Sequence, residues 1–177
     1  MSLVVNVAQL LKETVGSTRR VQAEGEIPTS DGGTDARAKG TARLVRTDEG
    51  VWVEGSFQAT AEAECSRCLV PFGLWVTLRL DEVFLPTVDV QIGRNVKPED
   101  GAEEHFTIDE HHTLDLTEAV RQYTTVAMPL KPLCGAHCQG FCPQCGTNLN
   151  EETCGCRPPM DPRWEPLKRF LVSDTDE

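Results

Sequence analysis

Eight cysteines constrain this chain most, because they occur as four closely spaced pairs with none left over. The pairs are Cys65 and Cys68, Cys134 and Cys138, Cys142 and Cys145, and Cys154 and Cys156. Two residues between cysteines let both thiolates reach one ion at about 2.3 Å, while the intervening amides donate to the sulfurs. The spacing therefore predicts that these eight residues hold one or two structural zinc ions (Zn2+).

Two groupings of the eight ligands into four-cysteine sites remain open. Loop closure favours local sites, although by only about 0.6 kcal/mol per doubling of loop length. Local grouping assigns the first four cysteines to one site and the last four to the other. The rival grouping joins the two Cys-x2-Cys pairs, as in a zinc ribbon.

The clearest periodicity lies in residues 51–64, where apolar or small residues alternate with polar ones. This alternation predicts a half-buried strand, with a bulge at Gly55. A shorter strand at about residues 41–47 precedes it through a turn at residues 48–50. A second alternating run occupies residues 72–81. The pair Cys65 and Cys68 is therefore expected at the turn of a β-hairpin.

Two short helices are also predicted from their capping residues. Asn6 with Gln9 forms a capping box for the first, and Asp115 with Glu118 forms one for the second. Residues 28–40 are interpreted as a polar connection and residues 86–113 as an acidic, aperiodic insert. The predicted fold class is α+β: an antiparallel hairpin or meander sheet with a few short helices in residues 1–130. A cysteine-rich zinc-knuckle segment, residues 131–177, packs on this core.

The chain is acidic, with 17 basic and 28 acidic residues and a net charge of −11. Such a field repels phosphates and argues against nonspecific binding to DNA or RNA. No stretch is apolar for long enough to span a membrane, and the first residues lack the basic flank of a signal peptide. We therefore expect a cytoplasmic protein, in which paired cysteines indicate metal more than disulfides.

Catalytic patterns are incomplete in this sequence. Cys138, Cys142 and Cys145 reproduce the spacing of radical-SAM enzymes, but only about thirty residues follow, too few for their barrel. A thioredoxin-like role for Cys65 and Cys68 requires a helix after the pair, and a strand is predicted there. We expect no catalytic residues. The alternative is a thiol redox or metal-dependent enzyme that acts through the Cys-x2-Cys pairs.

Four motifs in order resemble the YceD family, the large-subunit ribosomal RNA accumulation proteins. They are Cys65-Ser66-Arg67-Cys68-Leu69 with Pro71-Phe72, Met128-Pro129-Leu130-Lys131-Pro132-Leu133-Cys134, Gly140-Phe141-Cys142-Pro143-Gln144-Cys145-Gly146-Thr147-Asn148-Leu149-Asn150, and Asp161-Pro162-Arg163-Trp164 with Leu167. The resemblance runs from about residue 41 to residue 171. It implies a non-enzymatic bacterial factor in the processing or accumulation of large-subunit ribosomal RNA.

The partner that this resemblance implies is a large-subunit ribosomal precursor, a ribosomal protein or an assembly factor. The negative charge favours a basic protein, since complementary fields raise association rates. A second route is a local contact with ribosomal RNA near the metal segment. Its candidate residues are Arg67, Arg157, Arg163, Trp164, Lys168 and Arg169. The ordinary alternative for them is a solvated terminus in which Trp164 docks back on the core.

Overall fold

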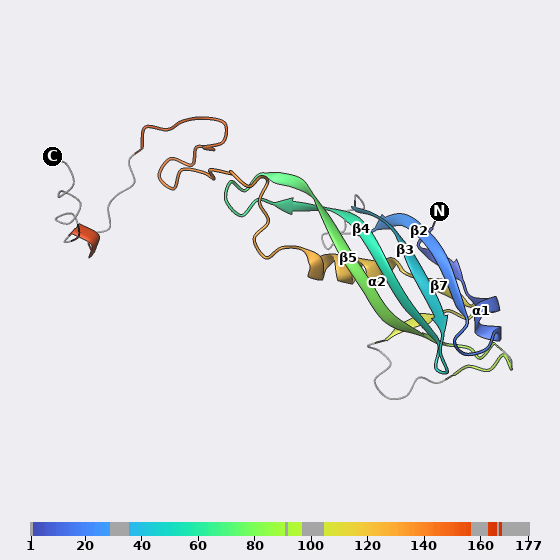
Figure 1. Ribbon diagram of the computed structural model, residues 1–177. Helices are drawn as coiled ribbons and strands as arrows, with labels where there is room; N and C mark the ends of the chain where they lie inside the picture. The colour runs from blue at the N-terminus through green and yellow to red at the C-terminus, as the bar shows by residue number, and fades with distance from the viewer. Residues whose placement is uncertain are drawn as a thin grey trace, which may run out of the picture. The chain divides into compact units, whose positions relative to one another are not determined.

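The computed structural model describes residues 2–28, 36–90, 92–96, 105–156, 163–165 and 167 (Figure 1). The chain divides into two compact units, one formed by Met1–Glu64 with Pro71–Pro132 and the other by Cys65–Val70 with Leu133–Glu177. The first unit contains the sheet and both described helices, and the second contains all eight cysteines. In the part of the chain that is described, neither helix has the length or apolarity to cross a membrane.

The first unit is a seven-stranded mixed sheet with two short helices. In chain order the elements are β1 (Val4–Asn6), α1 (Ala8–Lys12), β2 (Thr18–Ile27), β3 (Ala36–Arg46), β4 (Val51–Glu64), β5 (Pro71–Pro86), β6 (Phe106–Ile108), β7 (Thr113–Asp115) and α2 (Thr117–Ala127). The strand order is β1-β7-β6-β5-β4-β3-β2, and only β5 and β6 run parallel. The predicted class, a largely antiparallel sheet with a few short helices, is confirmed.

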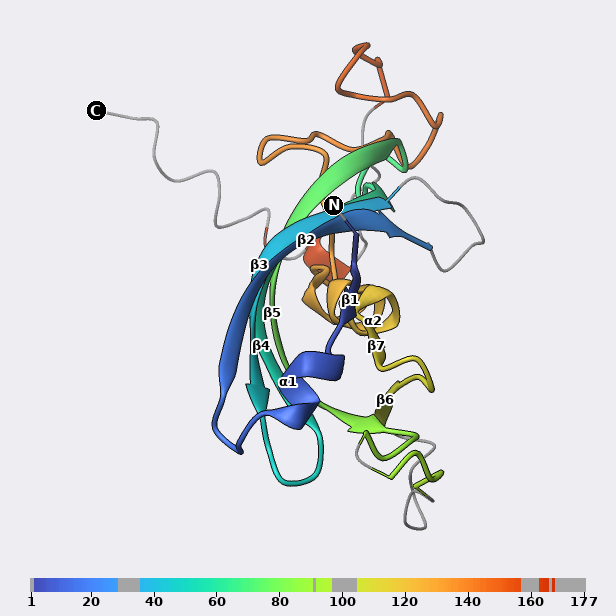
Figure 2. The same ribbon diagram turned by 90° about the vertical axis from the view of Figure 1, so that its right-hand side faces the viewer.

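The sheet curls until its two edges nearly meet. A Cβ atom on Gly25 of β2 would lie 3.0 Å from Cγ of Leu3, the residue before β1. Figure 2 shows α1 and α2 on the concave side of the curved sheet. Leu10, Leu116 and Val120 from this helical side are fully buried in the core. The other face of β2 to β5 is polar and exposed, as strand alternation requires.

The hairpin of β4 and β5 matches the prediction closely. Val51, Val53, Phe57 and Ala59 are fully buried, while the intervening residues are half-buried or exposed. Pairing with β5 is continuous from Val51 opposite Phe84 to Glu64 opposite Pro71. The loop of residues 65–70 is therefore the hairpin connection, as the sequence predicted.

The predicted bulge at Gly55 is wrong, because the register through Gly55 is uninterrupted on both sides. The glycine instead makes room for an aromatic ring. A Cβ on Gly55 would lie 2.8 Å from Cε2 of Phe57, and one on Gly40 would lie 2.5 Å from Cδ1 of the same ring. The Phe57 side chain thus packs directly over two glycine backbones in neighbouring strands.

Two segments assigned to loops contain strands. β3 begins at Ala36, inside the predicted connection of residues 28–40, and its partner β2 was not predicted. β6 and the start of β7 lie inside the predicted acidic insert of residues 86–113. Ile108 and Leu114 are fully buried in the core. Tertiary pairing supports β6 and β7, whose three-residue patterns are too brief to be recognised in the sequence.

Both predicted helices form, but the first is confined to Ala8–Lys12, after the strand Val4–Asn6, and neither predicted capping box is present. Val7 and Leu116 are the N-cap residues, and neither makes a side-chain cap hydrogen bond. The carboxylate of Asp115 instead accepts from the N–H of Thr117 at 2.8 Å. Glu118 accepts hydrogen bonds from Arg121 and Gln122, in that order of effect, which lower the pKa of the Glu118 carboxyl to about 2.

The replacement Gly40→Ala should destabilise the protein by about 1–3 kcal/mol, because the new methyl overlaps the Phe57 ring and the Ser56 carbonyl. Thermal unfolding should occur roughly 3–10 °C lower. Gly73→Ala is the matched control, since nothing lies within 4 Å of its Cβ position. Equal melting temperatures for both variants would contradict the packing of Phe57 described above.

Candidate metal centres

The eight cysteines gather in two groups of four. One comprises Cys65, Cys68, Cys134 and Cys138, and the other comprises Cys142, Cys145, Cys154 and Cys156. Within each group the sulfur atoms all lie within 4.8 Å of one another. This is the local grouping that loop closure favours, and the crossed grouping of the two Cys-x2-Cys pairs is not formed.

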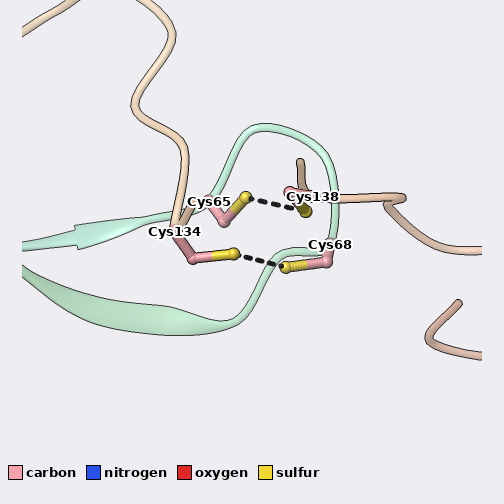
Figure 3. A group of neighbouring side chains, drawn as sticks. All are labelled: Cys65, Cys68, Cys134 and Cys138. Atoms are coloured by element: carbon pink, nitrogen blue, oxygen red, sulfur yellow. Dashed lines mark hydrogen bonds between the residues drawn. The ribbon is translucent and has the colours of Figure 1, made fainter. Parts of the chain in front are cut away.

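The sulfurs of the first group point toward a common centre (Figure 3). The Sγ atoms of Cys65 and Cys138 are 3.7 Å apart, and those of Cys68 and Cys134 are 3.6 Å apart. Four sulfurs around a tetrahedral ion at about 2.3 Å would be about 3.8 Å from one another, whereas a disulfide needs about 2.05 Å. The donor set and its spacing thus fit one tetrahedral metal ion.

Two separate segments, Cys65–Val70 and residues 142–147, each form a knuckle with the same backbone hydrogen bonds. In the first, the N–H of Leu69 donates to the carbonyl of Cys65 at 2.9 Å, and the N–H of Cys65 donates to Val70 at 3.0 Å. In the second, the equivalent bonds from residue 146 to residue 142 and from residue 142 to residue 147 are both 2.8 Å. The two knuckles are equivalent in backbone geometry and belong to different sulfur groups.

Leu69 and Gly146 occupy the equivalent position of the two knuckles, directly after the second cysteine. Their φ angles are 58° and 74°, both in the left-handed region. A glycine adopts this conformation without cost, whereas a leucine pays about 1–2 kcal/mol. The first knuckle therefore carries backbone strain that the second does not.

Amide donors in the first group favour ionisation of selected thiols. The N–H of Cys134 contributes most to lowering the pKa of Cys65 to about 6. Burial opposes ionisation of Cys138, but the Asn150 amide, which donates to its sulfur at 3.4 Å, leaves that pKa lowered. The neighbouring sulfurs, Cys68 first, raise the pKa of Cys134 to about 12. Four thiolates this close require a cation to ionise together.

In the second group, too, the pKa of one thiol is lowered and that of another is raised, but its cysteines are more exposed than those of the first group. The hydroxyl of Thr147, 3.1 Å from the sulfur of Cys145, contributes most to lowering the pKa of Cys145 to about 6. The sulfur of Cys145 is the largest cause raising the pKa of Cys156 to about 12. Cys145 and Cys156 are both exposed, while Cys142 is buried. Solvent and competing chelators therefore reach this group more easily than the first.

Residues around the first group brace its ligands. The guanidinium of Arg67 donates to the Cys138 carbonyl at 2.8 Å, and Asn150 accepts from the N–H of Gln139 at 2.8 Å. The φ of Gly140 is 79°, and a Cβ there would lie 3.0 Å from the Arg67 carbonyl. Cysteine spacing gives no signal for Asn150, so its role was not predicted.

The residues predicted to contact RNA or a partner protein lie in different parts of the second unit. Arg67 lies in the first knuckle, where it bonds to Cys138. Arg163 and Trp164 lie in a short turn of 3-10 helix, and the Trp164 side chain is 60% exposed. Arg157, Lys168 and Arg169 lie outside the described residues.

Two four-cysteine groups, one built on a hairpin connection and one on a local loop, define a cysteine-rich β-protein with two candidate metal centres. The chain belongs to the family of the large ribosomal RNA subunit accumulation protein YceD, whose family model matches residues 53–171. This family implies a role in large-subunit ribosomal RNA accumulation. Its name indicates no catalytic activity.

Relatives of the chain occur in mycobacteria. An uncharacterized protein of Mycobacterium tuberculosis and one of Mycobacterium bovis are each 31% identical over 142 residues, covering 76% of this chain and 62% of the relative. An uncharacterized protein of Mycobacterium leprae is 29% identical over 135 residues, covering 76% of this chain and 59% of the relative. The chain thus spans about three fifths of the length of these relatives. A comparison with solved structures finds no significant match.

Protein purified without added metal should contain two zinc ions per chain and no iron, one ion for each sulfur group. Cys65→Ser and Cys154→Ser should each lower the zinc content by one ion, because each removes one of four ligands from a different site. Elemental analysis gives the zinc and iron content. If both single changes released the same ion, or if the protein held no metal with unchanged stability, the two-site grouping would be wrong.

Leu69→Gly should leave the melting temperature unchanged or raise it, because glycine relieves the left-handed strain and the lost side chain is already 53% exposed. The matched change Gly146→Ala introduces strain at the equivalent position and should speed zinc loss from the second site. Zinc transfer to a chromophoric chelator measures both variants. Faster release from Leu69→Gly than from Gly146→Ala would contradict the equivalence of the knuckles.

Proposed function

We propose that this chain is a non-enzymatic zinc-binding factor in biogenesis of the large ribosomal subunit. It supports processing or accumulation of large-subunit ribosomal RNA through a ribosomal protein or an assembly factor. Family membership and the two four-cysteine groups support the proposal together. Family membership supports the proposed process, and the sulfur geometry supports a structural role for a metal.

The composition of the second unit's interior is the main support for a structural role of the metal. Among its described residues, the buried apolar side chains are Cys65, Cys68, Cys138 and Cys142. A unit without an aliphatic or aromatic core cannot be stabilised by hydrophobic burial alone. Metal binding supplies such units with folding free energy, about 10–16 kcal/mol for structural zinc in small domains. We infer that zinc holds this unit together.

The pairing of sulfurs favours this role over thiol redox chemistry. The close contacts in the first group are between Cys65 and Cys138 and between Cys68 and Cys134, so each joins residues far apart in sequence. A dithiol oxidoreductase instead exchanges a disulfide between the two cysteines of one Cys-x2-Cys pair. The cross-paired geometry suits four ligands of one ion, and a closed four-sulfur site leaves no open position for substrate.

The charge of the chain favours a basic partner. The net charge is −11 before any thiolate is counted, and a zinc ion with four thiolates adds a further −2. Basic ribosomal proteins present the complementary field, which speeds association and selects the partner. Naked RNA presents the same sign of charge, so this chain should bind it weakly.

A basic large-subunit protein, or a precursor particle that carries one, should bind more tightly than naked ribosomal RNA. That binding should weaken as salt is added, because opposite charges meet. Sedimentation with purified precursor particles at increasing salt measures it. Changing Arg163, Lys168 and Arg169 together to Glu should leave particle binding intact. The proposed route through a basic protein would be contradicted if the chain bound particles that lack protein and if the triple Glu variant lost this binding.

A further inference from the structure

Asn150 lies in the chain segment of one sulfur group but contacts a ligand of the other. In sequence it falls between Cys145 and Cys154, which both belong to the second group. Its side-chain amide nevertheless donates to the sulfur of Cys138, a member of the first group, at 3.4 Å. This hydrogen bond is therefore a direct link between the two candidate metal sites.

The neighbours of Asn150 fix which end of its amide faces the sulfur. The backbone N–H of Gln139 can only donate, and it lies 2.8 Å from Oδ1 of Asn150. Nδ2 is therefore the atom that faces Cys138. Its two hydrogens are used by the sulfur and by Oδ1 of Asn148, which is 2.9 Å away. The side chain cannot turn without losing hydrogen bonds at both ends of its amide.

A turn at residues 149–151 carries Asn150 and lies against the first group. The first residue of the turn donates its N–H to the carbonyl of Gly140 at 2.9 Å. Just before the turn, Oδ1 of Asn148 accepts from the backbone N–H of Asn150 at 3.1 Å. These bonds hold the turn beside the segment that directly follows Cys138.

A metal ion in the second group would fix both ends of the loop that contains this turn. Cys145 and Cys154 would bind the same ion, with eight residues between them. Closing a loop removes conformational freedom from it. With the second site empty, the loop regains that freedom, and holding Asn150 on the sulfur costs more conformational entropy. The state of the second site therefore acts on the first through this side chain.

We propose that Asn150 couples the two zinc sites, so that filling either site raises the affinity of the other. With the second site filled, the turn stays in place, and Asn150 donates to Cys138 as that sulfur binds the first ion. Groups that hydrogen-bond to a metal ligand change metal affinity by about 10- to 100-fold. The coupling is reciprocal, because the free energy of filling both sites does not depend on the order of filling. The inference rests on the zinc binding of the proposed function and adds an interaction between its two sites.

Alkylation of cysteines at buffered free zinc concentrations tests the coupling in the full-length protein. Cys134 and Cys145 are exposed members of the first and second groups. A thiolate that binds zinc is protected from iodoacetamide, so peptide mapping reports each site separately. Asn150→Asp keeps the acceptor for Gln139 but replaces the donor to the sulfur by a negative oxygen. It should raise the free zinc concentration that protects Cys134 by about tenfold.

A double-mutant cycle separates the coupling from a purely local effect. Cys154→Ser removes a ligand of the second site and should raise the zinc concentration that protects Cys134 about fivefold. It should cause no further loss in Asn150→Asp, because the link is already broken there. Asn148→Asp is the matched control, since it introduces the same charge two residues away and keeps the acceptor for Asn150. Protection of Cys134 should be the same in this control as in wild type.

Equal protection of Cys134 in wild type and in Asn150→Asp would overturn the inference, and so would additive effects of Asn150→Asp and Cys154→Ser. Asn150→Ala introduces no charge and should show the same lack of additivity, which separates loss of the donor from repulsion by a new carboxylate. If wild-type protein held two zinc ions without this coupling, the inference would fail while the proposed function stood. Protein that bound no zinc would overturn both.

Discussion

The convergence of four thiols on one point is the interaction on which the second unit depends. Sulfur atoms 3.6 and 3.7 Å apart cannot all be ionised without a cation, and the described residues of this unit include no buried aliphatic or aromatic side chain that could take their place. The backbone amide of Cys134 contributes most to lowering the pKa of Cys65, and the Thr147 hydroxyl contributes most for Cys145, so each group contains a thiol that ionises readily. Neighbouring sulfurs raise the pKa of Cys134 and of Cys156, and a bound cation would favour the loss of their protons.

Sequence reasoning located the cysteine sites because ligand spacing is a local property. Two residues between cysteines define a knuckle wherever it occurs, and a long alternation such as residues 51–64 defines a strand by itself. The hairpin connection at residues 65–70 follows from those two signals. The contacts that support the ligands could not be predicted from these signals. Asn150 donates to the sulfur of Cys138, and its position depends on a loop conformation that cysteine spacing does not determine.

The elements that sequence reasoning missed are those supported by distant partners. The inward positions of β2 include Arg19, Val21 and Gly25, a pattern too weak to predict a strand, and the strand is fixed by ten paired positions with β3. β6 and β7 have three residues each and pair with strands far away in the chain. The glycine of β4 was assigned to a bulge because a sequence cannot reveal which ring packs over it.

The net charge of the chain and the charges on the outer face of its sheet act over different distances. The net charge of −11 acts on a charged partner at long range. Close contacts depend on the few groups within a Debye length, about 8–10 Å at ordinary salt. On the outer face of β3, Arg37 lies beside Glu26 and Arg43 beside Glu54. Two of the three exposed basic side chains of this strand are therefore matched by acidic neighbours, and the acidity of the whole chain dominates its electrostatic interaction with a partner.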